Sequence, residues 1–294
     1  MHVGILYGTI CLTGHKFWVS LTKGKDKQMK KIALTSLIAM FAFAGAHAAN
    51  VIDGNPLYMP KKGHFYSETS LETSTRNVDA QVLGEEFGYG VTDRLAVNVM
   101  TTLAQEDWFE VGQWDTLGLG LTYRFADYQN WKWDFVGAYG VGPVWDAHNG
   151  FMKGRFLDKD DTRYDWMVGV RGGYTTHDFT LAGYVLMDYS NTKSFNWNDK
   201  DDSWHTLIAG LDAQLVLNNR WNLVSGAEYT KSLDHYSETP GAWELTFGAN
   251  YNIDATKYVG AYITKDIIHT QFPADGTWEV EDGFGMGVKF GVDF

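Results

Sequence analysis

Apolar side chains alternate with polar or small ones along most of the chain, from Gly63 to its last residue. A period of two is typical of a β-strand, whose successive side chains point to opposite faces. The alternating segments are roughly nine to thirteen residues long, the length that a tilted strand needs to cross a membrane. We count twelve of them, at residues 64–73, 78–91, 95–103, 113–125, 131–142, 163–174, 179–189, 204–217, 221–230, 242–251, 258–265 and 283–294.

The connections between these segments alternate in length. The short ones, at 92–94, 126–130, 175–178, 218–220 and 252–257, are rich in Asp, Asn and Thr, as tight turns require. The others, at 74–77, 104–112, 143–162, 190–203, 231–241 and 266–282, are mostly longer. This layout predicts an all-β fold: a closed antiparallel transmembrane β-barrel with short periplasmic turns and long extracellular loops. The sheet must close because hydrocarbon tolerates no unpaired strand edge.

The two faces of each segment differ in character. In 113–125 the odd positions from Leu117 to Phe125 are apolar or aromatic, and the even ones from Thr116 to Arg124 are small, polar or charged. A β-sandwich would also alternate. Large aromatics at the segment ends favour the barrel, since membrane barrels carry aromatic girdles at both interfaces. These are Tyr123, Phe125, Trp131, Trp133, Tyr174, Phe179, Trp221, Tyr251 and Tyr258.

The stretch FGYGVTDRLAVNV at 87–99 reads as one periplasmic hairpin. Leu95, Val97 and Val99 are predicted to face lipid, while Ala96 and Asn98 face the lumen. The phase of 78–91 shifts near 83–85, which suggests a bulge there. A wrong phase would exchange Asp79 and Gln81 between lipid and lumen.

The N-terminus contains the only long apolar run. Residues 29–48 combine a basic start, an apolar stretch from Ile32 to Ala44 and a small-x-small site at Ala46 to Ala48, as in a secretory signal peptide. A membrane anchor is the alternative, but the run is short for a span. Residues 1–28 are best explained by a mis-assigned upstream start. We therefore expect a signal peptide at 29–48, a short periplasmic segment at 49–62 and the barrel at 63–294.

Composition narrows the class further. The chain has 294 residues, 12 Trp, 16 Tyr, 17 Phe, 32 Gly and one Cys, with a mean hydropathy of −0.26. A helical membrane protein, with spans of about 20 apolar residues, does not fit. The formal net charge of −12 becomes more negative when the lysine-rich leader is removed. No disulfide is expected, and nucleic acid is excluded as a partner because the chain would repel it.

The last segment, GFGMGVKFGVDF, alternates apolar outward positions and ends on Phe294. It resembles the C-terminal strand of Gram-negative outer-membrane barrel proteins. That resemblance implies that Phe294 is the signal read by the barrel-assembly machinery. It also implies that outer-membrane lipid and lipopolysaccharide surround the barrel. The sequence LGEEFGYGVTDRLAVNV at 83–99 resembles the hairpins of transporter barrels of the phenol meta-cleavage pathway type. No residue role is carried over from that resemblance.

The charged residues predicted to face the lumen are the candidates for function. Two hypotheses compete: the inward charges line a water-filled channel for small polar or ionic solutes, or they pair with one another to fill a narrow, non-conducting structural or adhesive barrel. The candidates are Arg124, Lys132, Asp134, Arg163, Asp165, Arg171, Asp188, Asp212, Glu228, Glu244 and Lys289. The long connection 143–162 is a candidate constriction loop; its bulky residues are Trp145, His148, Phe151 and Phe156.

Catalysis is a weaker alternative. Outer-membrane lipid hydrolases use a Ser with a nearby His at the outer rim. Here the nearest spacings are Ser203 with His205 and His235 with Ser237, with Ser232 and His269 also near long connections. None of them forms a recognisable motif. No metal-ligand spacing or nucleotide-binding glycine loop is present, so we expect no enzyme activity, cofactor or metal.

Overall fold

The computed structural model describes residues 54–74, 80–105, 113–143, 162–192, 202–233, 242–268 and 283–294. These residues form twelve strands, and the predicted segments agree with them to within a few residues. The strands are β1 (Phe65–Ser74), β2 (Ala80–Thr92), β3 (Leu95–Gln105), β4 (Gln113–Tyr128), β5 (Trp131–Pro143), β6 (Thr162–Thr175), β7 (Phe179–Thr192), β8 (Asp202–Val216), β9 (Trp221–Ser232), β10 (Ala242–Asn252), β11 (Lys257–Ile268) and β12 (Phe284–Asp293).

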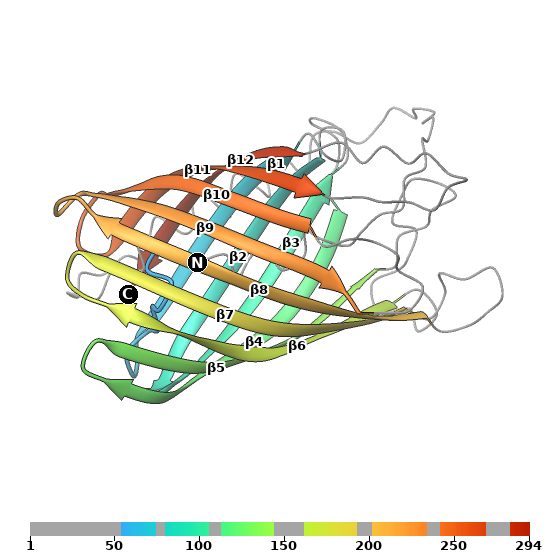
Figure 1. Cartoon of the computed structure of the whole chain (residues 1–294), viewed down its shortest axis with the longest axis horizontal. Coiled ribbons are helices and arrows are strands. Elements are labelled where there is room, and N and C mark those ends of the chain that lie inside the picture. Colours follow the sequence, from blue (N-terminus) through green and yellow to red (C-terminus); the bar gives the residue numbers. More distant parts are fainter. Residues whose placement is uncertain are drawn as a thin grey trace.

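Every strand pairs with its sequence neighbour in antiparallel register, and β12 returns to pair with β1, which closes the barrel. At this seam Thr69 faces Phe290 and Leu71 faces Val288. Figure 1 shows the strands inclined to the barrel axis, with the short turns gathered at one end. Within the described residues no helix is long and apolar enough to cross a membrane.

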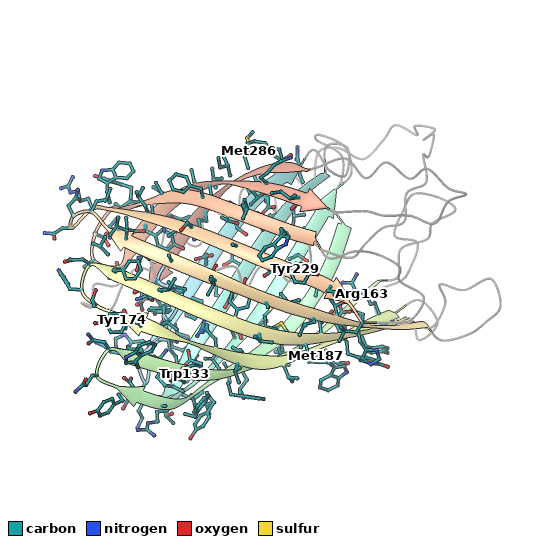
Figure 2. All side chains as sticks on the ribbon, in the orientation of Figure 1. Trp133, Arg163, Tyr174, Met187, Tyr229 and Met286 are labelled. Carbon is teal, nitrogen blue, oxygen red and sulfur yellow. The ribbon has the colours of Figure 1, made fainter. Side chains whose placement is uncertain are left out.

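Every strand exposes large apolar side chains on its outward face. Leu119, Phe247 and Val288 expose more than half of their side-chain surface there. Aromatics gather toward the short turns, where Trp131 lies against Tyr174 and Trp221 against Tyr251, with ring centroids 5.3 and 4.9 Å apart. Figure 2 places Trp133 and Tyr174 at this end.

A second aromatic group lies toward the opposite end of the barrel. It consists of the pairs Tyr139 with Trp166 and Tyr229 with Trp243, whose ring centroids are 4.4 and 5.0 Å apart. The barrel therefore has aromatic residues near both rims, as expected at two lipid-water boundaries. The sequence prediction recognised only the group beside the short turns.

Side chains in the short turns supply the hydrogen bonds that the turning backbone lacks. The Asn218 side-chain oxygen accepts from the amides of Arg220 and Trp221, and that of Asp254 accepts from the Thr256 amide. Burial acts to raise the pKa of Asp254, but the Thr256 hydrogen bonds and the Lys257 ammonium together hold that pKa below its ordinary value. These contacts explain why Asp, Asn and Thr concentrate in these connections.

The hairpin prediction is confirmed: Val97 and Val99 are outward and exposed, while Ala96 is buried inside. Two predictions were wrong. The register of β2 shifts between Gly90 and Thr92 rather than near residues 83–85. Tyr258 is not part of the outer aromatic group but points inward and is fully buried. Alternation could place Tyr258 on either face because it stands at the start of its strand.

Candidate functional site

The inside of the barrel is polar, unlike the core of a water-soluble protein. Among its most buried side chains are Thr116, Asp134, Asn222 and Asn250. By strand register, the charged residues predicted to face the lumen lie on the same face of the wall as these buried side chains. An apolar patch, made of Met167, Leu186 and Ile208 with Val136 and Ala138 beside them, covers one side of the wall; the sequence analysis did not anticipate it.

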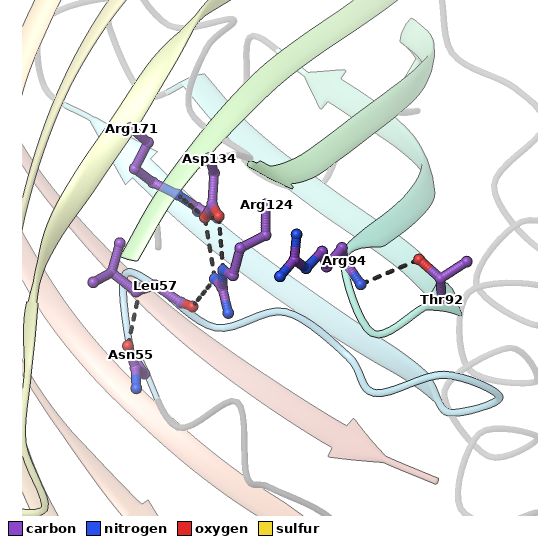
Figure 3. Close-up of polar contacts among 7 residues, drawn as sticks. All are labelled: Asn55, Leu57, Thr92, Arg94, Arg124, Asp134 and Arg171. Carbon is purple, nitrogen blue, oxygen red and sulfur yellow. Dashed lines mark hydrogen bonds and ion pairs between the residues drawn. The ribbon is translucent and has the colours of Figure 1, made fainter. Parts of the chain in front are cut away.

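A buried ion-pair cluster lies near the short turns. Arg124, Asp134 and Arg171 face one another in direct register across β4, β5 and β6. The Asp134 carboxylate accepts from Arg124 Nε at 2.8 Å and from Arg171 Nη2 at 2.7 Å, and it is fully buried (Figure 3). Two guanidinium groups on one carboxylate leave a local surplus of positive charge.

A second cluster lies toward the long connections, on the same side of the barrel. Arg163 Nε donates to Asp165 at 2.8 Å, and Arg163 Nη2 donates to the Thr116 hydroxyl at 3.0 Å. The Ser190 hydroxyl donates to the other Asp165 oxygen at 2.6 Å. Cations of the lumen wall are therefore concentrated on β4–β6.

The rest of the wall carries tyrosines that bridge to glutamates across glycines. Tyr262 on β11 and Glu72 on β1 both face Gly287 on the strand between them, and the Tyr262 hydroxyl donates to Glu72 at 2.8 Å. A Cβ on Gly287 would lie 2.3 Å from the tyrosine ring. Glycine thus lets the ring lie flat across the wall and reach a carboxylate two strands away.

The same arrangement of tyrosine, glycine and glutamate recurs twice. Tyr258 crosses Gly291 to Glu68, and Tyr184 crosses Gly210 to Glu228, with a 2.8 Å hydrogen bond in the second case. Tyr66 lies over Gly88 in a related way and donates to Glu86, which also accepts from Asn98 at 2.7 Å. These hydrogen bonds hold the glutamate side chains against the wall.

Several of these residues were missed by the sequence analysis. The inward acidic residues that were not among the candidates are Glu68, Glu72, Glu86, Asp266 and Asp293. The alternation Tyr66, Glu68, Ser70, Glu72 on β1 carried the signal. Acidic residues outnumber basic ones on the described inward face. The acidic set is Glu68, Glu72, Glu86, Asp134, Asp165, Asp188, Asp212, Glu228, Glu244, Asp266 and Asp293, against Arg124, Lys132, Arg163, Arg171 and Lys289.

One row of residues that are directly paired across neighbouring strands connects the cationic part of the lumen wall, on β4–β6, with the part that carries tyrosines and glutamates. It runs from Arg124 near the short turns to Asp266 near the long connections, rising because the strands are tilted. Three successive carboxylates, Glu228, Glu244 and Asp266, are direct cross-strand partners at its far end. The full row is Arg124, Asp134, Arg171, Tyr184, Gly210, Glu228, Glu244 and Asp266.

The N-terminal segment enters this lumen. We expected residues 49–62 in the periplasm, yet the described part, from Gly54, has Pro56 and Leu57 buried inside the barrel. Arg124 Nη2 donates to the Leu57 carbonyl at 2.7 Å (Figure 3), and the Tyr58 hydroxyl donates to Asp293 at 2.9 Å. Burial, and then the adjacent Asp293 carboxylate, raises the pKa of Tyr58 well above its ordinary value, so this hydroxyl stays a donor. Sequence alternation gives no signal for such a segment because it is not a strand.

Comparisons with known proteins agree with this architecture. No protein-family model matches the chain, and no curated protein matches it. Among solved structures, the COG4313 outer membrane channel from Pseudomonas putida F1 is 13% identical, over 81% of this chain and 97% of that chain, with a TM-score of 0.50. The fold is that of an outer-membrane β-barrel.

Two other outer-membrane barrels are similar at lower TM-scores. The translocator domain of the autotransporter NalP from Neisseria meningitidis is 12% identical, over 90% of this chain and 95% of that chain, with a TM-score of 0.48. The KdgM porin in complex with disordered oligogalacturonate is 9% identical, over 78% of this chain and 99% of that chain, with a TM-score of 0.46. At such identities the likeness concerns the fold alone.

In an outer-membrane β-barrel the outward face meets lipid, and the described part of that face here includes a hydrogen-bonded carboxylate between apolar positions. Glu85 on β2 is the cross-strand partner of Thr69 and Thr101. Its oxygens accept from the hydroxyls of Ser67 and Thr69 at 2.7 and 2.5 Å. Leu83 and Phe87 flank it on the same face, so Glu85 sits within the apolar band.

Of the Ser and His residues considered for catalysis, His205 is the one whose side chain the structure describes. His205 lies on the outward face of β8 with its ring 5.0 Å from that of Tyr189. The side chains of Ser203 and Ser232, the residues His235, Ser237 and His269, and the constriction-loop candidates Trp145, His148, Phe151 and Phe156 fall outside what the structure describes. Among the described residues no group of His, Cys, Asp or Glu is arranged to hold a metal ion.

Proposed function

We propose that this barrel is a passive channel for small polar or ionic solutes in the outer membrane of a Gram-negative bacterium, with a preference for cations. A cleaved signal peptide would export the chain, and the barrel-assembly machinery would insert it among lipopolysaccharide and phospholipid. The observation that carries the proposal is the run of three directly paired carboxylates, Glu228, Glu244 and Asp266.

Like charges directly opposite one another destabilise a sheet, so charge pairing between the strands does not favour such a run. A charged lumen wall does favour permeation of the opposite charge, since rings of charge set the barriers that ions meet. The surplus of inward carboxylates over inward cations gives this preference its sign. The cations that are present lie mostly on β4–β6, where Asp134 and Asp165 hold them in ion pairs.

Reversal potentials across a KCl gradient test the proposal in planar bilayers. We expect stepwise currents with a potassium preference, which the double variant Glu228→Gln and Glu244→Gln reduces. Two unit charges about 4 Å apart in water interact by about 1 kcal/mol. Removal of one such interaction between a carboxylate and a permeating cation should therefore change the ratio of potassium to chloride permeability roughly fivefold. Glu85→Gln, which neutralises a carboxylate on the opposite face, is the matched control and should leave the preference unchanged.

Two outcomes would contradict the proposal. Equal effects of the lumen and control variants would show that the inward carboxylates do not set selectivity. Absence of current from the folded wild-type barrel, and also from a variant whose luminal N-terminal segment has been replaced, would exclude a channel. A non-conducting structural or adhesive barrel would then stand, an alternative favoured by the buried ion pairs and the segment inside the lumen.

A further inference from the structure

The N-terminal segment, residues 54–62, crosses the lumen from one wall to the opposite one. At Gly54 it presses on β9 and β10, where an added Cβ would lie 2.4 Å from the Asn250 side chain and 2.7 Å from that of Val224. Three residues later the Leu57 carbonyl accepts from Arg124 on β4. In the closed strand order β10 and β4 lie on opposite sides of the barrel.

This short crossing means that little open width remains at that level. Three residues extend over at most about 11 Å, since each spans up to about 3.6 Å. Arg124 and Asn250 reach inward from either wall to meet the segment, and Pro56 and Leu57 are buried between them. A hollow remains on each side: one is bordered by Tyr58, Met59 and Met100, the other by Pro56, Asp212 and Glu228.

The segment then turns back and is fixed near the short turns. Tyr58 donates to Asp293 on β12 and packs edge-on against Tyr66 on β1, with ring centroids 5.7 Å apart. The Gly63 amide donates to the Gly90 carbonyl at 2.8 Å, and a single parallel bridge joins Lys62 to Gly90. Gly90 is needed here because a Cβ would collide with the Lys61 carbonyl oxygen at 1.9 Å.

Among the described residues this attachment differs from that of a strand. Each strand of the wall is held by ladders on both edges, whereas residues 54–62 have one isolated bridge and a few side-chain contacts. One hydrogen bond makes a net contribution of about 0.5–1.5 kcal/mol to the stability of the fold, so a few of them can be broken without unfolding the barrel. The wall and the segment are therefore separable structures.

We propose that residues 54–62 form a plug that closes the periplasmic end of the lumen and must be displaced before solutes pass. The inference rests on the channel function proposed above. It adds a closed resting state, in which Arg124 and Asp293 act as the two latches, one for the Leu57 carbonyl and one for the Tyr58 hydroxyl. Asp134 positions the Arg124 latch by binding its guanidinium group.

The test replaces residues 54–60 by an equally long Gly/Ser stretch and leaves the barrel intact. Folding of each variant is checked by its heat-dependent shift in gel mobility. In planar bilayers with KCl the replaced chain should show severalfold larger conductance or a severalfold longer open time than the wild type. Tyr58→Phe, which removes one latch only, should increase open time to a smaller extent, while Tyr128→Phe, at an exposed position beside a short turn, should not.

The outcomes separate the plug from the channel. A measurable wild-type conductance that the replacement leaves unchanged would refute the plug and keep the channel. Current from the replaced chain alone would support both. Folded barrels that conduct in neither form would overturn the channel and, with it, the plug.

Discussion

At the residue scale, Glu85 is the position where the chain departs most clearly from what a lipid-facing surface requires. Ionisable groups on that face are costly, and the cost is greatest near the middle of the bilayer. The hydroxyls of Ser67 and Thr69 supply two donors to this carboxylate. These two hydrogen bonds replace part of the hydration that the carboxylate loses, and so they lower the free-energy cost of placing it against lipid.

Glu85→Gln should raise the free energy of unfolding by about 1 kcal/mol, somewhat less than the 2–4 kcal/mol measured for basic residues at the midplane. The amide oxygen still accepts from one hydroxyl while the charge is gone. Urea titration of the barrel in lipid vesicles, followed by tryptophan fluorescence, measures the change. A decrease in stability would mean that the two hydroxyl contacts outweigh the burial of charge. Glu228→Gln, in the wet lumen, serves as the comparison.

At the element scale, the tyrosine, glycine and glutamate rows connect three strands each. The ring covers the glycine of the middle strand and the hydroxyl reaches the third strand, so a row resists sliding of any one strand against the next. The inward glycines of these rows therefore make room for the tyrosine rings that join the strands. This also accounts for their position in direct register with Tyr184, Tyr258 and Tyr262.

Gly287→Ala should destabilise the barrel by about 1–3 kcal/mol, the usual cost of overpacking a tight contact. The new methyl group would lie 2.3 Å from the Tyr262 ring. Gly137→Ala is the control, since its nearest neighbour would be 3.7 Å away. Equal midpoints of urea unfolding for the two variants would contradict the packing argument. Adding Tyr262→Ala should remove most of the penalty of Gly287→Ala, because the obstructing ring is gone.

At the scale of the whole molecule, the seam between β1 and β12 decides whether the sheet becomes a barrel. Beyond the last ladder pair, the amides of Phe65 and Phe294 donate to each other's carbonyls at 2.7 and 2.8 Å. The two rings stack with centroids 6.0 Å apart. Phe294 thus ties the last residue of the chain to the start of the first strand.

Phe294→Ser should lower the yield of folded barrel both in cells and in refolding into pure lipid vesicles, because the seam loses its terminal ring contact. Phe247→Ser, an exposed outward position on β10, controls for the loss of one lipid-facing aromatic. The gel-mobility shift of the folded form gives the yield. A defect confined to cells would assign Phe294 to recognition by the assembly machinery and not to closure.

The sequence by itself determined the strand number, the turn positions and the inward phase of Arg124, Asp134, Glu228 and Lys289. It could do so because a period of two and the contrast between lipid and water act on every strand separately. Tertiary structure alone decided which inward charges meet, that Tyr258 bridges to Glu68, and that Leu57 lies against Arg124. Those contacts depend on the stagger between strands and on the path of a segment without periodicity, so they arise only when the barrel closes.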